Sequence, residues 1–274
     1  MCRLFKVLQT NACRNNCTYC AYRRDRSCTR VATTPDEMAE AFDTVHKKRL
    51  VDGLFLSSGI TRTPEHTMSK MIDTAHILRN KYKYPGYIHL KIMPGTPTDC
   101  IRESLRVSNR VSLNIESPTE TDLLTLSPDK SMKDGFFKTL MRIKSEIDRL
   151  KSIRRRVPSL TTQFVVGAGN EKDMDIIKMT NLLYKEFGLW RVFYSAFRPV
   201  PETPLQEKPP ESPWRQNRLY QADFLMRFYK FAPSDLPLRE DGNLYEGIDP
   251  KLLWAQQNPE FFPVDINNSD YWTL

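Results

Sequence analysis

Three features are missing or scarce in this 274-residue chain, and each excludes a class of protein. No apolar run approaches membrane-spanning length, so we expect no transmembrane segment. No secretory signal precedes the cysteines, and we therefore expect a cytoplasmic protein in a compartment that keeps thiols reduced. Beyond a single C-x2-C there is no second such pair and no Cys/His pair, and histidine occurs four times. A zinc knuckle made of two pairs is therefore not indicated.

What is present fits one large α/β domain, or one domain with an appendage, because 40% of the residues are hydrophobic and 27% are charged. Lysine and arginine outnumber aspartate and glutamate by 41 to 33. Four of the arginines gather in one segment, at Arg23, Arg24, Arg26 and Arg30. Such a segment favours a polyanionic partner such as nucleic acid, although a solvated surface is the simpler interpretation of any charge cluster.

The most informative segment is a C-x3-C-x2-C pattern formed by Cys13, Cys17 and Cys20, with Tyr19 just before the last thiol. It supplies three thiolates and no fourth. A four-iron cube has four irons to ligate, so three cysteines in one short loop hold three of them and leave the last iron open to a small molecule. Because open coordination positions are typical of catalytic metal centres, the pattern predicts a [4Fe-4S] cluster that takes part in chemistry.

Two other interpretations of the cysteines stay open at this point. A structural zinc site could use Cys17 and Cys20, with Cys13 or Cys28 adding ligands. A disulfide is less favoured, since three cysteines within eight residues cannot all pair with one another. Cys2 and Cys28 could be core thiols, cluster neighbours or hydrogen donors to a radical, whereas Cys100 is expected to be plain packing.

Short apolar runs alternate with helical patterns six times, which is typical of β-α units around a parallel sheet. The predicted strands cover residues 6–9, 53–58, 87–93, 110–117, 161–166 and 191–197. Two helices are expected to begin with a Thr-Pro capping signal, at Thr34 and at Thr96. A fifth helix should follow Asn170 and stop at Gly188, and a last one is expected around residues 218–228 after a proline-rich crossing.

The alternation of side chains along each strand also predicts which of them point into the lumen of the barrel. Apolar residues at alternate positions must meet the helices, and the opposite sets are polar. These polar sets are His89, Lys91 and Met93 on one strand, Ser112, Asn114 and Glu116 on the next, and then Gln163 and Ser195. Polar groups at the carboxyl ends of barrel strands usually belong to an active site, although they can also form a network that only rigidifies the barrel. For His89, early in its strand, the structural role is favoured.

The cysteine spacing together with Tyr19 resembles the signature of the radical S-adenosylmethionine (SAM) superfamily. The resemblance implies a partial TIM barrel of six β-α units with a short helical C-terminal extension. It also implies that SAM fills the vacant iron and that an electron from an external donor cleaves it, so that a 5'-deoxyadenosyl radical abstracts hydrogen from a substrate. It assigns Ser57, Ser58 and Gly59 to the SAM amino group, Asn114 and Glu116 to its ribose or carboxylate, Gly167 to the adenine and Tyr19 to the nucleoside.

Within the superfamily, the chain looks like the radical SAM group named for DNA modification or repair. The resemblance is carried by residues 6–11, 53–59, 87–91, 94–95, 113–116, 194–196 and 219–223. Members of that group start earlier and continue into a helix-hairpin-helix that grips DNA phosphates, whereas this sequence stops at Leu274. The resemblance therefore implies either a fragment or a version without that DNA grip.

These observations lead to a partition and a function as hypotheses. Residues 1–200 should form the partial barrel, and residues 201–274 the proline-rich crossing and helical extension. The leading function is hydrogen abstraction from a nucleotide or nucleic-acid substrate. Two alternatives are a radical SAM enzyme that acts on a small metabolite or protein side chain, and an iron-sulfur nucleic-acid-binding module without turnover. No residue is singled out as catalytic, and nothing indicates an oligomeric state.

Overall fold

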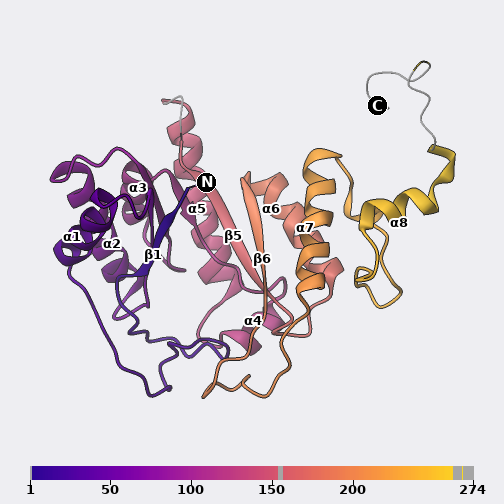
Figure 1. The fold of residues 1–274 in the computed structure, drawn as a ribbon, viewed down its shortest axis with the longest axis horizontal. Coiled ribbons are helices and arrows are strands. Elements are labelled where there is room, and N and C mark those ends of the chain that lie inside the picture. The colour runs from indigo at the N-terminus through magenta and orange to yellow at the C-terminus, as the bar shows by residue number, and fades with distance from the viewer. Residues whose placement is uncertain (1, 154–156, 262–266, 268–274) are drawn as a thin grey trace.

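The computed structural model describes residues 2–153, 157–261 and 267 of the chain (Figure 1). Its centre is a six-stranded sheet in which every neighbouring pair is parallel and the strands lie in chain order. The strands are β1 (Leu4–Leu8), β2 (Gly53–Ser57), β3 (Tyr87–Lys91), β4 (Arg110–Ser112), β5 (Ser159–Val166) and β6 (Arg191–Ala196). All six predicted strands are thus confirmed, and the fold is an α/β half-barrel.

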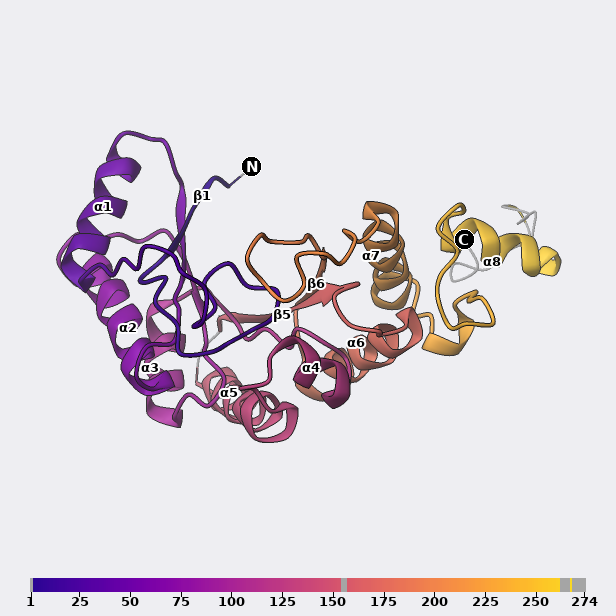
Figure 2. The same cartoon turned by 90° about the horizontal axis from the view of Figure 1, so that it is seen from below.

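Helices form an arc around the outer side of this curved sheet, and loops occupy the inner side (Figure 2). The helices are α1 (Pro35–Lys47), α2 (Pro64–Asn80), α3 (Thr98–Val107), α4 (Glu120–Leu126), α5 (Lys138–Lys151), α6 (Asp173–Phe187), α7 (Pro213–Phe228) and α8 (Pro250–Gln257). A π-helical turn at Met132–Phe137 leads into α5, and short 3-10 turns lie at Pro233–Asp235 and Pro259–Phe261. No helix among the described residues is long and apolar enough to cross a membrane.

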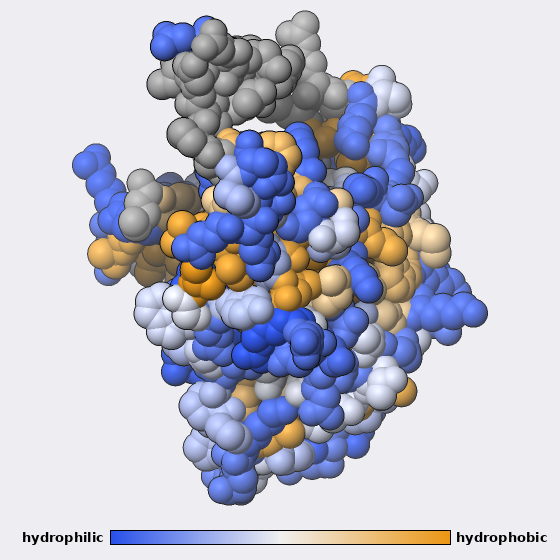
Figure 3. Space-filling view, turned by 90° about the vertical axis from the view of Figure 1, so that its right-hand side faces the viewer, coloured by the Kyte–Doolittle hydropathy of each residue, from blue (hydrophilic) through white to orange (hydrophobic). Residues whose placement is uncertain are grey.

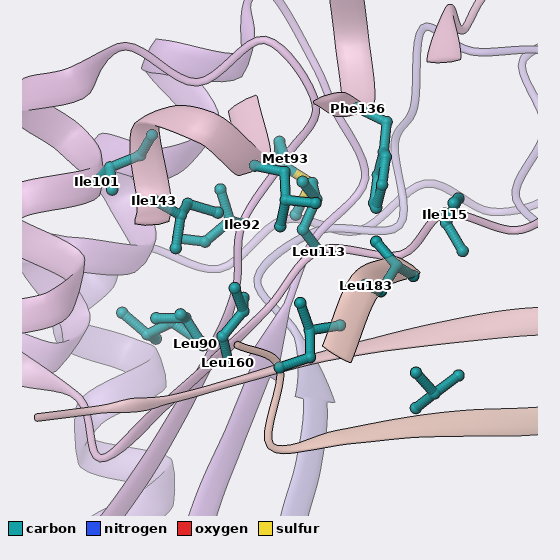
Figure 4. Packing of buried hydrophobic residues seen from close by; sticks show 14 of the residues in the cluster. Leu90, Ile92, Met93, Ile101, Leu113, Ile115, Phe136, Ile143, Leu160 and Leu183 are labelled. Atoms are coloured by element: carbon teal, nitrogen blue, oxygen red, sulfur yellow. The ribbon is translucent and has the colours of Figure 1, made fainter. Parts of the chain in front are cut away.

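The core lies between the sheet and the helices. Leu90, Ile92 and Leu113 point from the strand side toward Ile101 and Ile143 of the helices (Figure 4). All five side chains are fully buried. This packing confirms the predicted alternation, because the apolar face of each strand is covered by helices and the polar face is left to the interior of the half-barrel.

Helix termini were predicted with mixed success. Thr34 caps α1 in a full capping box with Glu37, and Gly188 ends α6 in the left-handed conformation with φ of 62°, as expected. The capping signal at Thr96 was wrong. Helix α3 begins at Thr98, and the Thr96 hydroxyl donates to Met93 O at 2.6 Å, so that it closes the preceding turn instead. The N-cap position of α3 is occupied by Pro97, so Thr96 lies one residue too early to cap the helix.

Strand β4 is shorter than predicted and ends at Ser112 rather than near Ser117. Beyond it the chain still follows β5, since Leu113 N donates to Thr161 O and Glu116 N donates to Gln163 O, each at 3.1 Å. Glu116 itself has a φ of 69°. A left-handed conformation costs a residue with a side chain on the order of 1 kcal/mol or more. The strand therefore gives way to an irregular segment that re-aims the side chains at its end.

After β6, the proline-rich crossing leads to α7, which packs against β6 and α6, while α8 packs against α7. Helix α7 begins at Pro213, five residues earlier than the prediction of a helix around residues 218–228. The molecular face on the α7 and α8 side is mainly hydrophilic, with apolar patches between the polar residues (Figure 3). Residues 262–266 and 268–274, the end of the predicted extension, lie outside the described part.

Candidate functional site

The cysteine loop lies at the carboxyl end of the sheet, next to α4 and the proline-rich crossing (Figure 1). Cys13, Cys17 and Cys20 all line one cavity of about 170 Å³. The ends of β2, β3 and β4 supply the other walls, through residues that include Ser57, Lys91 and Asn114. Because carboxyl ends of parallel strands meet at one edge, residues far apart in the sequence converge here.

Backbone contacts hold the loop in this place. Arg14 N donates to Ile60 O at 2.6 Å, and Thr18 N donates to Leu126 O at 2.9 Å. The loop passes so close to Gly59 that a Cβ there would lie 2.2 Å from Ala12 O. Gly59 is therefore required for the close approach of the loop, a role that its resemblance to a SAM-binding turn did not suggest.

The arginines that follow the cysteines serve the loop as well. The Arg30 guanidinium donates to the carbonyls of Asn11, Tyr22, Arg23 and Arg26 at 2.7 to 3.0 Å. Arg26 donates to Ala21 O and Pro201 O, each at 3.1 Å, and thereby ties the loop to the proline-rich crossing. These two guanidinium groups are largely committed to main-chain carbonyls, which leaves Arg23 and Arg24 as the members of the cluster with side chains less bound to the backbone.

The three thiols line the same cavity. In a four-iron cube each of these cysteines would bind a different iron. In a zinc site each thiolate would lie about 2.3 Å from the same ion. Iron and zinc analysis of the protein distinguishes these two ligand sets.

An ion pair is buried beside the cysteines. Lys130 Nζ lies 3.1 Å from Glu116 Oε1, and their side chains are 14% and 4% exposed. The Tyr19 hydroxyl lies near the same carboxylate and helps to lower the pKa of Glu116. Burial alone would raise the pKa of Glu116, but the ammonium groups of Lys130 and Lys91 outweigh it and hold this pKa below its usual range. Glu116 is thus a carboxylate, although it is out of contact with water.

Two larger cavities adjoin the one at the cysteines. One, of about 720 Å³, lies along the inner face of the half-barrel and reaches from Lys6 to Gln163. The other, of about 390 Å³, lies at the ends of β5 and β6 and is bounded by α7. The Tyr19 ring lines all three cavities, so it stands where they meet. Its burial raises the pKa of Tyr19 well above the usual value, and the phenol stays protonated.

The structure brings almost all the predicted site residues together. Around the cavity of the cysteines lie Tyr19, Ser57, Ser58, Gly59, Asn114 and Glu116. Gly167 is the exception, because it lines a separate polar groove and has a φ of 84°. Its amide donates to the Glu171 carboxylate at 2.5 Å, and Gly169 N donates to the same group at 3.1 Å. Gly167 thus shapes the turn after β5 and does not line the interior cavities.

Sequence reasoning missed one important residue, and it undervalued another. Lys130 follows α4 in an irregular segment, so no periodicity placed it near Glu116. Lys91 was assigned to the interior face but not to the site. It lines both the cysteine cavity and the larger cavity. Burial lowers the pKa of Lys91, and the charge of Glu116 only partly offsets this effect. Cys100 packs against the core, as expected.

Comparison with known proteins places this geometry in context. A profile of the radical SAM superfamily matches residues 7–183. The threonylcarbamoyladenosine tRNA methylthiotransferase of Thermotoga maritima is 26% identical over 207 residues, which are 71% of this chain and 43% of that enzyme. The 7,8-didemethyl-8-hydroxy-5-deazariboflavin synthase of Methanococcoides burtonii is 24% identical over 254 residues, 89% of this chain and 72% of that enzyme. The chain thus spans less than half of the tRNA enzyme.

A solved structure agrees at the level of the fold. Methylornithine synthase superposes with a TM-score of 0.65 at 16% identity, over 84% of this chain and 63% of the other. The superfamily consists of enzymes that use a [4Fe-4S] cluster and SAM. The match of the profile to most of the half-barrel, together with this shared fold, establishes that the chain belongs to the radical SAM superfamily.

Proposed function

We propose that this protein binds a [4Fe-4S] cluster through Cys13, Cys17 and Cys20 and uses SAM to abstract hydrogen from a nucleotide or nucleic-acid substrate. The observation that carries the proposal is the shared cavity of the three thiols with Asn114 and Glu116. When bound, the cluster supplies the electron that splits SAM. The half-barrel supplies everything else: it orients the two reactants, excludes water and positions the substrate.

Each of the smaller cavities suits one part of SAM. The cavity of about 170 Å³ adjoins the thiols, so we assign the amino-acid end of SAM to it, beside Ser57, Ser58 and Gly59. The cavity of about 390 Å³ is walled by Tyr19, Val165 and Phe197 and is suited to a flat adenine. Gly167 shapes the turn that directly follows Val165 and Val166 at the end of β5. This position supports an indirect role for Gly167 in binding the adenine. Asn114 and Glu116, between the two ends, are assigned to the ribose or the carboxylate.

In this assignment Glu116 is an acceptor and Lys130 is a positioning residue. A buried carboxylate keeps its charge because Lys130 lies beside it, and a charged acceptor forms stronger hydrogen bonds than a neutral one. Tyr19 lies near the same carboxylate, on the side assigned to the nucleoside. The pair thus presents a fixed hydrogen-bond acceptor to SAM without adding net charge.

Two observations support a nucleic-acid substrate: the net charge of +8 and the similarity to an enzyme that modifies tRNA. The resemblance to the DNA modification and repair group agrees with them. The second candidate, a small metabolite, is supported by the similarity to deazariboflavin synthase over 89% of the chain. We further propose an external electron donor, a cytoplasmic location, and a division at residue 200 between the half-barrel and its extension.

The assignment of the cluster to three cysteines predicts that these cysteines, and not Cys100, are needed to bind iron. Replacing Cys13, Cys17 or Cys20 by Ala should abolish the cluster, because two thiolates cannot retain it, whereas the core residue Cys100 replaced by Ala should leave it intact. Iron and sulfide analysis of protein purified without oxygen measures this, with about four irons per chain expected in the unmodified protein. Stoichiometric zinc without iron would refute the assignment.

The Glu116–Lys130 pair is predicted to affect SAM and not the cluster. Glu116→Gln, Lys130→Met and Asn114→Ala should keep their iron but bind SAM about tenfold more weakly, since a hydrogen bond to a charged or polar group contributes about 1 to 3 kcal/mol. The exposed residue Glu40 provides the control, as Glu40→Gln. Binding of SAM and its half-saturation in 5'-deoxyadenosine formation are measured together. Unchanged values in all three variants would make these residues structural.

The substrate class is tested by stimulation of SAM cleavage. Reduced, cluster-loaded protein should form 5'-deoxyadenosine faster when DNA or RNA is added, because a bound substrate orders the cavity around SAM. The effect should weaken with salt as phosphate contacts are lost. No 5'-deoxyadenosine under any condition would favour a binding module without turnover. Stimulation by small metabolites but not by nucleic acid would favour the second candidate.

A further inference from the structure

Lys91 is a charged residue on the wall of two interior cavities. It lies at the end of β3, between the cysteine cavity and the cavity of about 720 Å³, and it lines both. In the described part of the chain, its ammonium group makes no hydrogen bond or ion pair, whereas the nearby Lys130 is paired with Glu116 at 3.1 Å. Lys91 is partly buried, and an ammonium group with reduced access to water is stabilised by a ligand that carries negative charge.

Another lysine lies on the wall of the large cavity. Lys6 lines this cavity from β1, and its ammonium nitrogen lies 5.5 Å from the centre of the Phe55 ring. Among the described residues that line the large cavity, Glu116 supplies the only carboxylate, and Lys130 already neutralises it.

The other walls of this cavity suit a small polar ring. Asn114 and Gln163 reach it with side-chain amides that form no hydrogen bond within the described residues, whereas Gln9 and Asn11 are occupied by contacts to Thr33 and Val31. Phe55 and Tyr22 add aromatic surface. A volume of about 720 Å³ lies within the range of roughly 300 to 1,000 Å³ that is usual for small-molecule sites.

We propose that the large cavity holds one nucleotide unit of the substrate and that Lys91 binds its phosphate. This inference rests on the proposed function and gives its substrate site a charged anchor. The phosphate lies toward Lys91, with Lys6 at the more exposed rim, and the unpaired Gln163 amide faces the base. Because the ammonium group needs a counter-charge, the site selects a phosphorylated nucleotide over the corresponding nucleoside.

The test compares thymidine 5'-monophosphate with thymidine, which lacks the charge, in equilibrium dialysis with cluster-loaded, SAM-bound protein. The unmodified protein should bind the monophosphate at least about tenfold more tightly. Lys91→Met should remove this preference, because the variant lacks the ammonium group. Lys178→Met, at an exposed position on α6, should behave as the unmodified protein.

Two results would overturn the assignment: equal binding of the two probes to the unmodified protein, or an unchanged preference in Lys91→Met. If Lys91→Met does not fold, the comparison of the two probes on the unmodified protein still tests the assignment. Inorganic phosphate should displace the monophosphate, and equal displacement by acetate would assign the site to carboxylates instead. The proposed function has its own test. If the protein prefers the monophosphate but no nucleic acid stimulates SAM cleavage, the proposed function is contradicted and the phosphate site is not.

Discussion

The close contact between Gly59 and the backbone of the cysteine loop is the constraint on which the site depends. A side chain at this position would collide with Ala12 O, so only glycine lets the loop lie across the ends of the strands. Hydrogen bonds to Ile60 and Leu126, and the Arg30 guanidinium within the loop, then fix its course. As a result the three thiols share a cavity with residues of three different strands. The half-barrel contributes rigidity, and the loop contributes the chemistry.

The distribution of charge in the interior follows a simple pattern. Glu116 and Lys130 neutralise each other beside the thiols, so this region gains a fixed acceptor without net charge. Lys91 has no such partner among the described residues, and it faces the open part of the interior. The first arrangement offers a fixed acceptor to SAM, whose ammonium and sulfonium groups outweigh its carboxylate and leave a net positive charge. The second suits an anionic substrate. Lys91 and Lys130, which both line the cysteine cavity, therefore serve different ligands in this account.

Much of this organisation could be predicted from the sequence, for identifiable reasons. Alternation predicted the strands and the inward direction of Asn114 and Glu116, since a period of two directly reports the faces of a strand. Thr34 was predicted correctly and Thr96 was not, because the same capping residues can also close the preceding turn. The left-handed backbone of Glu116 and its pairing with Lys130 arise from an irregular segment without periodicity. Arg30, read as part of a basic surface, braces the loop through backbone carbonyls that have no signature in the sequence.

The central claim is that three cysteines hold a four-iron cube and leave one iron open to SAM. Electron paramagnetic resonance of the reduced protein tests it most directly, because a ligand that binds an iron alters the signal of the whole cluster. The account predicts a signal typical of a reduced [4Fe-4S] cluster that changes when SAM is added. A signal that saturating SAM leaves unaltered, or the absence of any iron signal in protein prepared without oxygen, would contradict it.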